Sequence, residues 1–203
     1  MTRLLVATAN PKKLLELKGL LADLPLQLVC LKDIAKYEEV PEDGSSFQEN
    51  AAKKALGYAH QTGLLTLAKD SGLCCDALEG APGIYSARFA GPGKNDRDNN
   101  LKLLRLLEKV PDNCRGAHFI SAVAVAEPGR LVGAAEGTVH GIIDHQIRGT
   151  RGFGYDPVFY YPPFAKTFGE VPMELKHQVS HRSRALKNAK GLLQGCLSKK
   201  GEE

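Results

Sequence analysis

Apolar runs and amphipathic stretches alternate along the chain, and this alternation predicts a mixed α/β protein. Residues 4–7 form an apolar run that ends in polar residues and a proline, the pattern of a strand followed by a turn. Between residues 12 and 24, leucines recur at helical spacing, and residues 26–31 form a second apolar run. The chain is therefore expected to open with a strand, a helix and a strand.

The same patterns predict the remaining elements. Ser46-Phe47-Gln48-Glu49 has the form of a capping box and begins a helix after an acidic loop at residues 38–45. Helices are expected at residues 46–61, 96–109 and 183–197, and strands at residues 64–68, 119–126, 131–139 and 158–161. The strand at 64–68 delivers Asp70 at its end, and residues 73–78 continue it or pair with it. Because strands and helices mix without a compositional break, residues 1–198 are expected to form one α/β domain, with residues 199–203 as a disordered tail.

Composition narrows the class of protein. With 203 residues, of which 43% are hydrophobic and 25% charged, the chain is typical of a globular domain with a real core. The net charge of +4 suits an anionic ligand, but scattered basic residues and an aromatic content of 6% argue against a nucleic-acid-binding surface. No apolar run approaches membrane-spanning length, the N-terminal residues lack a leader pattern, and the five cysteines lack metal-ligand spacing. A cytoplasmic protein with reduced thiols and no membrane partner is expected.

Two segments have the residue types that bind phosphate and metal. The first lies between the first predicted strand and its helix, where backbone N–H groups and lysines can face an anion; it consists of Thr8, Ala9, Asn10, Pro11, Lys12 and Lys13. The second is Asp70-Ser71-Gly72, since Mg²⁺ takes one or two carboxylates, and an aspartate there can also deprotonate a water. Glu42 is the first candidate for a second carboxylate, followed by Asp43 and Glu39. A plain strand-to-helix turn and a plain Asp-Ser-Gly turn are the alternatives.

Three further groups of residues are candidates for ligand binding. Asn50 and Lys54 are four residues apart and share a helix face, which either binds ligand or is solvated. The segment 152–157 combines glycines, which allow close backbone approach, with aromatic rings on which a base can stack, and a hairpin with a buried tyrosine is equally consistent. Lys176, His181 and Arg182 bring cationic and titratable groups together, and the planar guanidinium suits a keto oxygen or a phosphate; a helix cap by Ser180 is the alternative.

Taken together, these blocks resemble the non-canonical purine nucleoside triphosphate pyrophosphatases, the inosine triphosphate pyrophosphatase family. The resemblance rests on short blocks that follow one another nearly end to end, at residues 8–13, 47–55, 70–73, 80–88, 152–157 and 180–186. It implies Mg²⁺-dependent hydrolysis of ITP, dITP and XTP to the monophosphate and pyrophosphate, and a homodimer. It also implies an elongated two-lobed α/β fold, with a mixed central β-sheet flanked by helices and the active site in a cleft between the lobes.

The resemblance further implies a role for each matching residue. The triphosphate would be held by residues 8–13 and Lys54, and the metal by Glu42 and Asp70, with Asp70 also as proton acceptor. The nucleotide, chiefly its base end, would be held by Ser71, Phe153, Gly154, Tyr155, Asp156, Lys176, His181 and Arg182.

One position departs from the pattern of this family. Similar proteins usually carry two acidic residues before the Ser-Gly pair, whereas here Lys69 replaces the first. A lysine beside Asp70 opposes a bound cation, although neighbouring strand residues face opposite ways and the effect can be indirect. The sequence therefore predicts a pyrophosphatase or, as the alternative, a nucleotide-binding relative with weak or lost catalysis.

Overall fold

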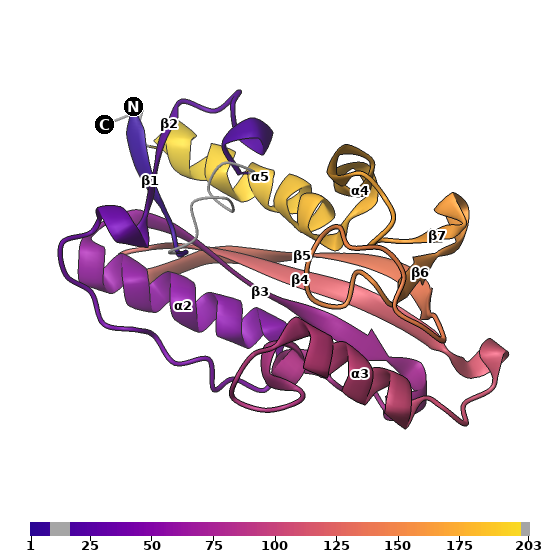
Figure 1. The fold of residues 1–203 in the computed structure, drawn as a ribbon. Helices are drawn as coiled ribbons and strands as arrows, with labels where there is room; N and C mark the ends of the chain where they lie inside the picture. The colour runs from indigo at the N-terminus through magenta and orange to yellow at the C-terminus, as the bar shows by residue number, and fades with distance from the viewer. Residues whose placement is uncertain (9–16, 200–203) are drawn as a thin grey trace. The chain divides into compact units, whose positions relative to one another are not determined.

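The computed structural model describes residues 1–8 and 17–199, and these form a mixed seven-stranded β-sheet with flanking helices (Figure 1). The strands are β1 (Thr2–Val6), β2 (Leu26–Cys30), β3 (Leu65–Cys75), β4 (Gly116–Glu127), β5 (Arg130–Ile143), β6 (Phe159–Tyr161) and β7 (Lys166–Thr167). They pair in the order β2-β1-β3-β4-β5-β6-β7. β1 is parallel to β2 and β3, whereas β6 is antiparallel to β5 and β7. The predicted mixed sheet is confirmed.

Helices of two kinds complete the fold. The α-helices are α2 (Phe47–Thr62), α3 (Asp96–Leu106), α4 (Met173–Val179) and α5 (His181–Lys199). The 3₁₀ helices are η1 (Leu31–Asp33), η2 (Asp76–Leu78), η3 (Gly83–Arg88), η4 (Asp112–Cys114) and η5 (Pro162–Phe164). Among the described residues, no helix has the length and apolar character that crossing a membrane requires.

The chain divides into two compact units, each with its own core. Unit 1 comprises Met1–Asp70, Ser121–Gly137 and Ser183–Glu203, and unit 2 comprises Ser71–Ile120 and Thr138–Arg182. Unit 1 therefore contains β1, β2, α2 and most of α5, while unit 2 contains α3, α4, β6 and β7.

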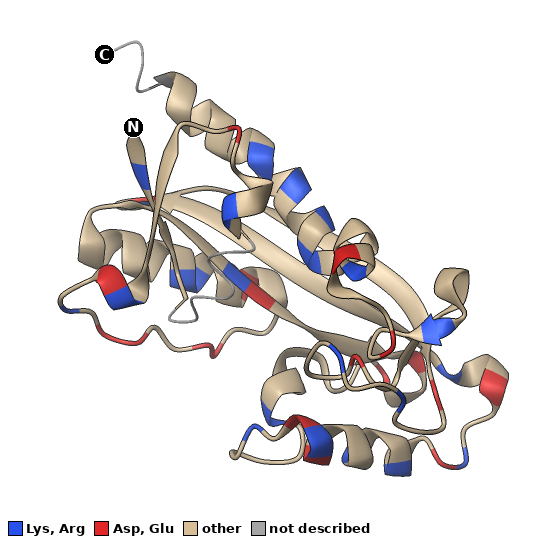
Figure 2. Ribbon diagram, turned by 45° about the horizontal axis from the view of Figure 1, so that its top comes forward, with Lys and Arg blue, Asp and Glu red and all other residues tan. Residues whose placement is uncertain are grey.

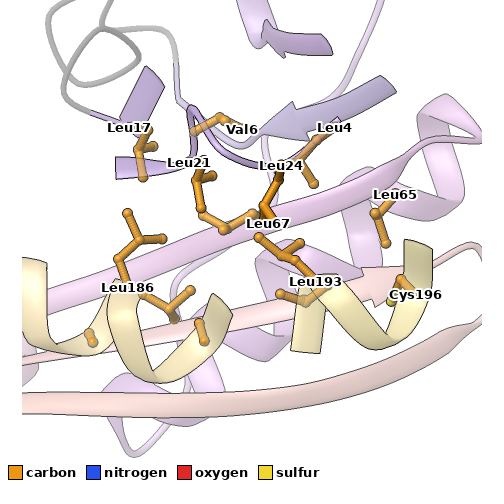
Figure 3. Packing of buried hydrophobic residues seen from close by; sticks show 14 residues of the cluster. Leu4, Val6, Leu17, Leu21, Leu24, Leu65, Leu67, Leu186, Leu193 and Cys196 are labelled. Carbon is orange, nitrogen blue, oxygen red and sulfur yellow. The ribbon is translucent and has the colours of Figure 1, made fainter. Parts of the chain in front are cut away.

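The core of unit 1 explains why its first strand is a continuous apolar run. Leu4 and Val6 belong to a cluster that includes Ala189 and Leu193 of α5, and Figure 3 shows leucines of β1, β3 and α5 converging there. Leu5, between them, belongs to a second cluster with Tyr58 of α2. Because both faces of β1 are buried at residues 4–6, each of these positions gains from being apolar, by about 1.5–3 kcal/mol for a fully buried large side chain.

Helix α2 begins where its capping box predicts. The Ser46 Oγ accepts a hydrogen bond from the Glu49 N–H at 3.0 Å, and Gly63 ends the helix with a left-handed φ of 69°. The Glu49 carboxylate accepts from the backbone N–H and the hydroxyl of Ser45, each at 2.8 Å, rather than from Ser46. These bonds, with Lys53 nearby, lower the pKa of Glu49 to about 2.

Aromatic rings fill the core of unit 2. The ring centroids of Phe119 and Phe159 are 4.5 Å apart, and those of Phe159 and Phe168 are 5.1 Å apart. Leu103 and Leu107, at the end of α3, belong to the same cluster. Their burial fixes α3 in unit 2, and the first turn of this helix contacts the loop at residues 152–156.

Several expectations are corrected. β3 is one strand of 11 residues, so Asp70 lies inside it rather than at its end; Ser71-Gly72 suits a turn in isolation, but the sheet keeps the chain extended. The seven-residue helix α4 was not predicted, because it is too short to show a helical period in the sequence.

Two predicted segments lie partly outside the described residues. Of the helix expected at residues 12–24, residues 17–20 are helical, and residues 12–16 lie outside the described part. α5 extends to Lys199, and the rest of the predicted tail, residues 200–203, also lies outside the described part.

Candidate functional site

Unit 1 contains a pocket of about 380 Å³ with charged walls. Its polar lining residues are Thr8, Glu39, Glu42, Lys54 and Lys69, and its apolar wall includes Leu31, Tyr37, Tyr58 and Leu67. Thr8 is the one described residue of the predicted phosphate segment that lines this pocket, and Ala9, Asn10, Pro11, Lys12 and Lys13 lie outside the described residues. The pocket thus brings together Thr8, Glu42 and Lys54, three residues that the sequence indicated separately.

Lys54 is the buried cation of this pocket. The residue is 9% exposed, and its Nζ donates to Glu42 Oε1 at 2.9 Å and to the backbone oxygen of Lys69 at 2.7 Å. An ammonium group has three donors, and these two contacts hold it at one place in the pocket wall. Lys54 is therefore a fixed positive charge beside a carboxylate, which suits a phosphate ligand that arrives with a cation.

Asn50, one turn before Lys54 on α2, connects the acidic loop to Asp70. The side chain is 1% exposed, its Oδ1 accepts from the Gly44 N–H at 2.7 Å, and its Nδ2 donates to Asp70 Oδ2 at 3.0 Å. An amide that both accepts and donates in a buried site has a single favourable orientation. Asn50 therefore orients the Asp70 carboxylate, a role that its spacing from Lys54 did not reveal.

The acidic loop is an extended segment that runs antiparallel to α2. In Figure 2, acidic positions follow one another along the segment beside α2. Every second residue of the loop contacts α2 about one helical turn earlier, in the pairs Glu38–Gln61, Val40–Tyr58, Glu42–Lys54 and Gly44–Asn50. Asp43 instead pairs with the exposed Lys53 at 3.1 Å. Of the three carboxylates considered for the metal, Glu42 and Glu39 line the pocket. Asp43 does not belong to the pocket lining and forms its ion pair with Lys53.

Lys69 and Asp70 differ in their relation to the pocket. Lys69 is part of the pocket wall together with Leu67, which lies two residues earlier on the same face of β3. Asp70 is the next residue along and is held by Asn50. The unusual lysine therefore lines the same pocket as Glu42 and Lys54.

A second candidate cluster lies in unit 2, around the loop at residues 152–156. The Asp156 carboxylate, 2% exposed, accepts from the Phe153 N–H at 2.8 Å and from Lys176 Nζ at 2.5 Å. The Phe153 ring is 44% exposed, and the Arg182 guanidinium lies 4.1 Å from its centroid. The His181 ring, 2% exposed, stacks on Phe119 at 4.8 Å. A half-exposed ring with a guanidinium over its face suits an aromatic, hydrogen-bonding ligand.

Tyr155 does not fit the expectation that its ring stacks on a base. It is 4% exposed, belongs to the core of unit 2, and donates its hydroxyl hydrogen to the Ser86 backbone oxygen at 2.8 Å. Burial raises the pKa of this phenol well above its ordinary value. The exposed aromatic of the loop is Phe153. Tyr155 is buried, as in the alternative of a hairpin with a buried tyrosine, but residues 152–157 form turns rather than a hairpin.

The sequence indicated two carboxylates, Glu42 and Asp70, as the ligands of a metal ion. Within the described residues, no three acidic, histidine or cysteine side chains gather closely enough to hold an ion by themselves. Glu42 and Asp70 are oxygen donors of unit 1, and Mg²⁺ commonly uses one or two carboxylates, with water and phosphate oxygens completing its shell. The donor set therefore fits an ion that arrives with a phosphorylated ligand.

In this α/β protein, unit 1 thus presents a charged pocket, and unit 2 presents a half-exposed aromatic ring beside a guanidinium. The chain belongs to the Ham1 family, whose model matches residues 4–192. It is 50% identical over 191 residues to the dITP/XTP pyrophosphatase of Desulforamulus reducens, covering 94% of this chain and 95% of that protein. It is also 50% identical over 186 residues to the dITP/XTP pyrophosphatase of Geobacter sulfurreducens, covering 92% of this chain and 94% of that protein. A solved HAM1 protein from Coxiella burnetii matches with a TM-score of 0.89 and 37% identity, over 96% of this chain and all (100%) of that chain.

Proposed function

We propose that this protein hydrolyses non-canonical purine nucleoside triphosphates, namely dITP, XTP and ITP, to the monophosphate and pyrophosphate. The observation that carries this proposal is the 50% identity to a dITP/XTP pyrophosphatase over 94% of the chain. Two features support it, each within its own unit: the charged pocket of unit 1 suits phosphate groups, and the aromatic cluster of unit 2 suits a base. In the cell it would clear unwanted nucleotides from the cytoplasmic pool, and the enzyme would be a homodimer.

The phosphate end of the substrate is assigned to unit 1. Lys54 is already fixed in the pocket wall, and the segment at residues 8–13 adds two lysines in the sequence. Glu42 and Asp70 would hold Mg²⁺, which when bound screens the charge of the phosphates and makes phosphorus easier to attack. Without such positive charges, the negative triphosphate would repel an approaching water oxygen.

Asp70 is assigned the role of proton acceptor. A water oxygen forms a bond to the α-phosphorus, the bridging bond from that phosphorus to the β-phosphate oxygen breaks, and pyrophosphate leaves. The proton released by the water passes to the Asp70 carboxylate. Asn50, which donates to Asp70 Oδ2 at 3.0 Å, keeps this carboxylate in one orientation during the step.

The base end is assigned to unit 2. Phe153 offers a half-exposed face for stacking, Arg182 and His181 offer donors for a 6-keto oxygen, and Gly154 and Ser71 would line the bound nucleotide. An adenine would place an amino group against those donors, and sites built on such polar contacts discriminate strongly. Lys176 and Asp156 form a buried pair, so we assign them to holding Phe153 rather than to direct contact.

The test is pyrophosphate release from dITP, XTP, ITP, dATP and dGTP, with Mg²⁺ and with a chelator. We expect release from the first three, dependence on Mg²⁺, and loss of turnover in Asp70→Asn with an unchanged melting temperature. Asp43→Asn is the matched control, because this exposed carboxylate belongs to the same unit and pairs outside the pocket lining. Equal rates on all five triphosphates, or full activity of Asp70→Asn, would refute the proposal.

A second candidate function rests on Lys69. Since this lysine lines the pocket with Glu42, it opposes a cation there, and the protein would then bind the nucleotide but turn it over slowly. Lys69→Asp is expected to raise kcat, whereas Lys36→Asp, the same charge change on an exposed loop residue, is expected to leave it unchanged. Calorimetric binding of dITP without pyrophosphate release by the unsubstituted protein would favour this candidate, and equal or lower release by Lys69→Asp would remove it.

A further inference from the structure

The first two turns of α3 hold the loop that presents Phe153. Asp96 Oδ2 accepts a hydrogen bond from the Gly154 N–H at 2.6 Å, and Asn100 Nδ2 donates to the Gly154 oxygen at 2.8 Å. Asp96 and Asn100 are four residues apart and so lie on one face of the helix. Both polar backbone atoms of Gly154, the residue directly after Phe153, are therefore bound by one helix.

These two side chains are not explained by the needs of the helix itself. Asn95 already caps α3, because its Oδ1 accepts from the N–H groups of Arg97 and Asp98 at 2.9 and 3.2 Å. The Asp96 carboxylate is thus available for the loop. Asn100 is 2% exposed, and its Nδ2 donates to the Asp96 backbone oxygen at 2.7 Å as well as to Gly154. A flipped amide would place an oxygen against two carbonyl oxygens, so the donor orientation is fixed.

Hydrogen bonds rather than packing hold this side of the loop. A pocket of about 460 Å³ is lined by Asp96, Asn100 and residues 150–154, so apolar packing is incomplete here. Gly154 has a left-handed φ of 61°, and a glycine in a loop has more backbone conformations open to it than any other residue. Loss of either bond would therefore leave Gly154 free to move in a space that is already open.

The position of Gly154 determines that of the Phe153 ring. On one side Asp156 accepts from the Phe153 N–H at 2.8 Å, and on the other Asp96 accepts from the next N–H along the chain. The backbone is thus held immediately before and after the Phe153 α-carbon. The ring itself is 44% exposed and has the Arg182 guanidinium 4.1 Å from its centroid, so its direction depends largely on the backbone.

We infer that Asp96 and Asn100 are positioning residues that set base selectivity through Gly154 and Phe153. The inference rests on the proposed function, in which Phe153 and Arg182 read the base. When the hydrogen bonds of Gly154 with Asp96 and Asn100 are lost, the Phe153 ring moves relative to the Arg182 guanidinium. Stacking on the base is then no longer coupled to recognition of its 6-keto group. Discrimination between dITP and dATP then falls more than kcat for dITP does, because the proposed phosphate and water contacts involve other residues.

The test compares two aspartates of the same helical turn. Asp96→Ala and Asp98→Ala each remove one acidic side chain from the first turn of α3, and so weaken the helix dipole interaction alike, but only Asp96 contacts Gly154. For Asp96→Ala we expect KM for dITP to rise about tenfold, as for loss of one charge-assisted hydrogen bond, and the dITP/dATP ratio of kcat/KM to fall. Asp98→Ala should match the unsubstituted protein in both, and Asp96→Asn, which keeps an oxygen for the Gly154 N–H, should restore most of the ratio.

Amide hydrogen exchange at Gly154 separates this inference from the proposed function, because it needs no turnover. Faster exchange in Asp96→Ala and in Asn100→Asp, but not in Asp98→Ala, is expected. Unchanged exchange, or a lower melting temperature and kcat at a constant dITP/dATP ratio, would overturn the positioning role. If the unsubstituted protein released no pyrophosphate from any purine triphosphate, the proposed function would fail, and the selectivity role would fail with it. The exchange result would still decide whether Asp96 and Asn100 hold Gly154 in place.

Discussion

Lys176 and Asp156 form an ion pair that is buried within unit 2. The two side chains are 4% and 2% exposed, and their charged atoms are 2.5 Å apart. Lys176→Met keeps an unbranched stem of similar length but removes the charge, which leaves the Asp156 carboxylate buried without this cation. If Lys176 is mainly structural, the damage appears in the free energy of unfolding; if it mainly contacts the substrate, it appears in KM.

The expected loss can be estimated from the burial of the pair. Removing one partner of a buried ion pair costs about 3–5 kcal/mol, because the other charge is left uncompensated. For a chain of this length, each kcal/mol lowers the melting temperature by about 2–4 °C, so a fall of about 6–20 °C is expected. The double variant Lys176→Met/Asp156→Asn has neither charge and should lose only about 1 kcal/mol, the net value of a hydrogen bond.

Equilibrium unfolding in urea of the four proteins of this double-mutant cycle supplies the measurement. Strong coupling between the two positions is expected, because each single variant should lose about 3–5 kcal/mol whereas the double variant should lose only about 1 kcal/mol. Lys166→Met serves as control, since this lysine is exposed in the same unit and its loss should change stability little. A loss below about 1 kcal/mol for Lys176→Met, or losses that simply add in the double variant, would refute the reasoning.

Three further predictions concern unit 2. Tyr155→Phe removes the 2.8 Å bond to the Ser86 oxygen and should cost about 1–2 kcal/mol in urea unfolding with an unchanged KM for dITP; a raised KM at full stability would instead place the ring against the base. Burial and the nearby His140 lower the pKa of His118 below its ordinary 6.5, so its protonation opposes folding. Stability should therefore fall as the pH drops below 6.5, and urea midpoints at about pH 7.5 and 5.5 should differ less in His118→Gln; an equal difference would exclude His118 as the cause. Gly152→Ala places a residue with a side chain at a φ of 76°, and its Cβ would meet the Asp156 carboxylate oxygen. The free energy of unfolding, measured by thermal unfolding, should fall by about 1–3 kcal/mol, and an unchanged stability would contradict this prediction.

Local sequence patterns predicted the helices and strands whose buried positions or capping residues recur at a fixed spacing. The apolar run at Leu4 and Leu5 indicated a strand because both of its faces are covered, and the parallel pairing of β1 with β2 confirms the two predicted strands. Of the helix predicted between them, residues 17–20 are helical in the described part of the chain. The capping residue Ser46 marked the start of α2 because its side chain satisfies a helix N–H whatever the tertiary structure. In these two elements, the residues that determine the local structure lie within a few positions of it in the sequence.

The roles of residues that contact distant parts of the chain could not be predicted from local sequence patterns. Asn50 joins Gly44 to Asp70, which is 20 residues further on, and nothing in the spacing of α2 reveals it. Asp96 acts on a loop 58 residues away. Tyr155 and Phe153 are adjacent aromatics in one motif, yet only the packed structure shows which ring is buried. Such assignments follow from tertiary contacts, for which a single sequence has no period or spacing.

The alternating contacts between the acidic loop and α2 limit how the length of this loop can change. An extended chain advances about 6.6 Å in two residues and a helix rises about 5.4 Å per turn, and these steps are similar enough for side-chain contacts to recur at every second loop residue from Glu38 to Gly44. Surface loops usually tolerate inserted residues, but one residue added here after Val40 would turn Glu42 away from Lys54 and place a different side chain opposite the ammonium. Variation in this protein should therefore leave the number of residues between Glu38 and Gly44 unchanged, even where their identities differ.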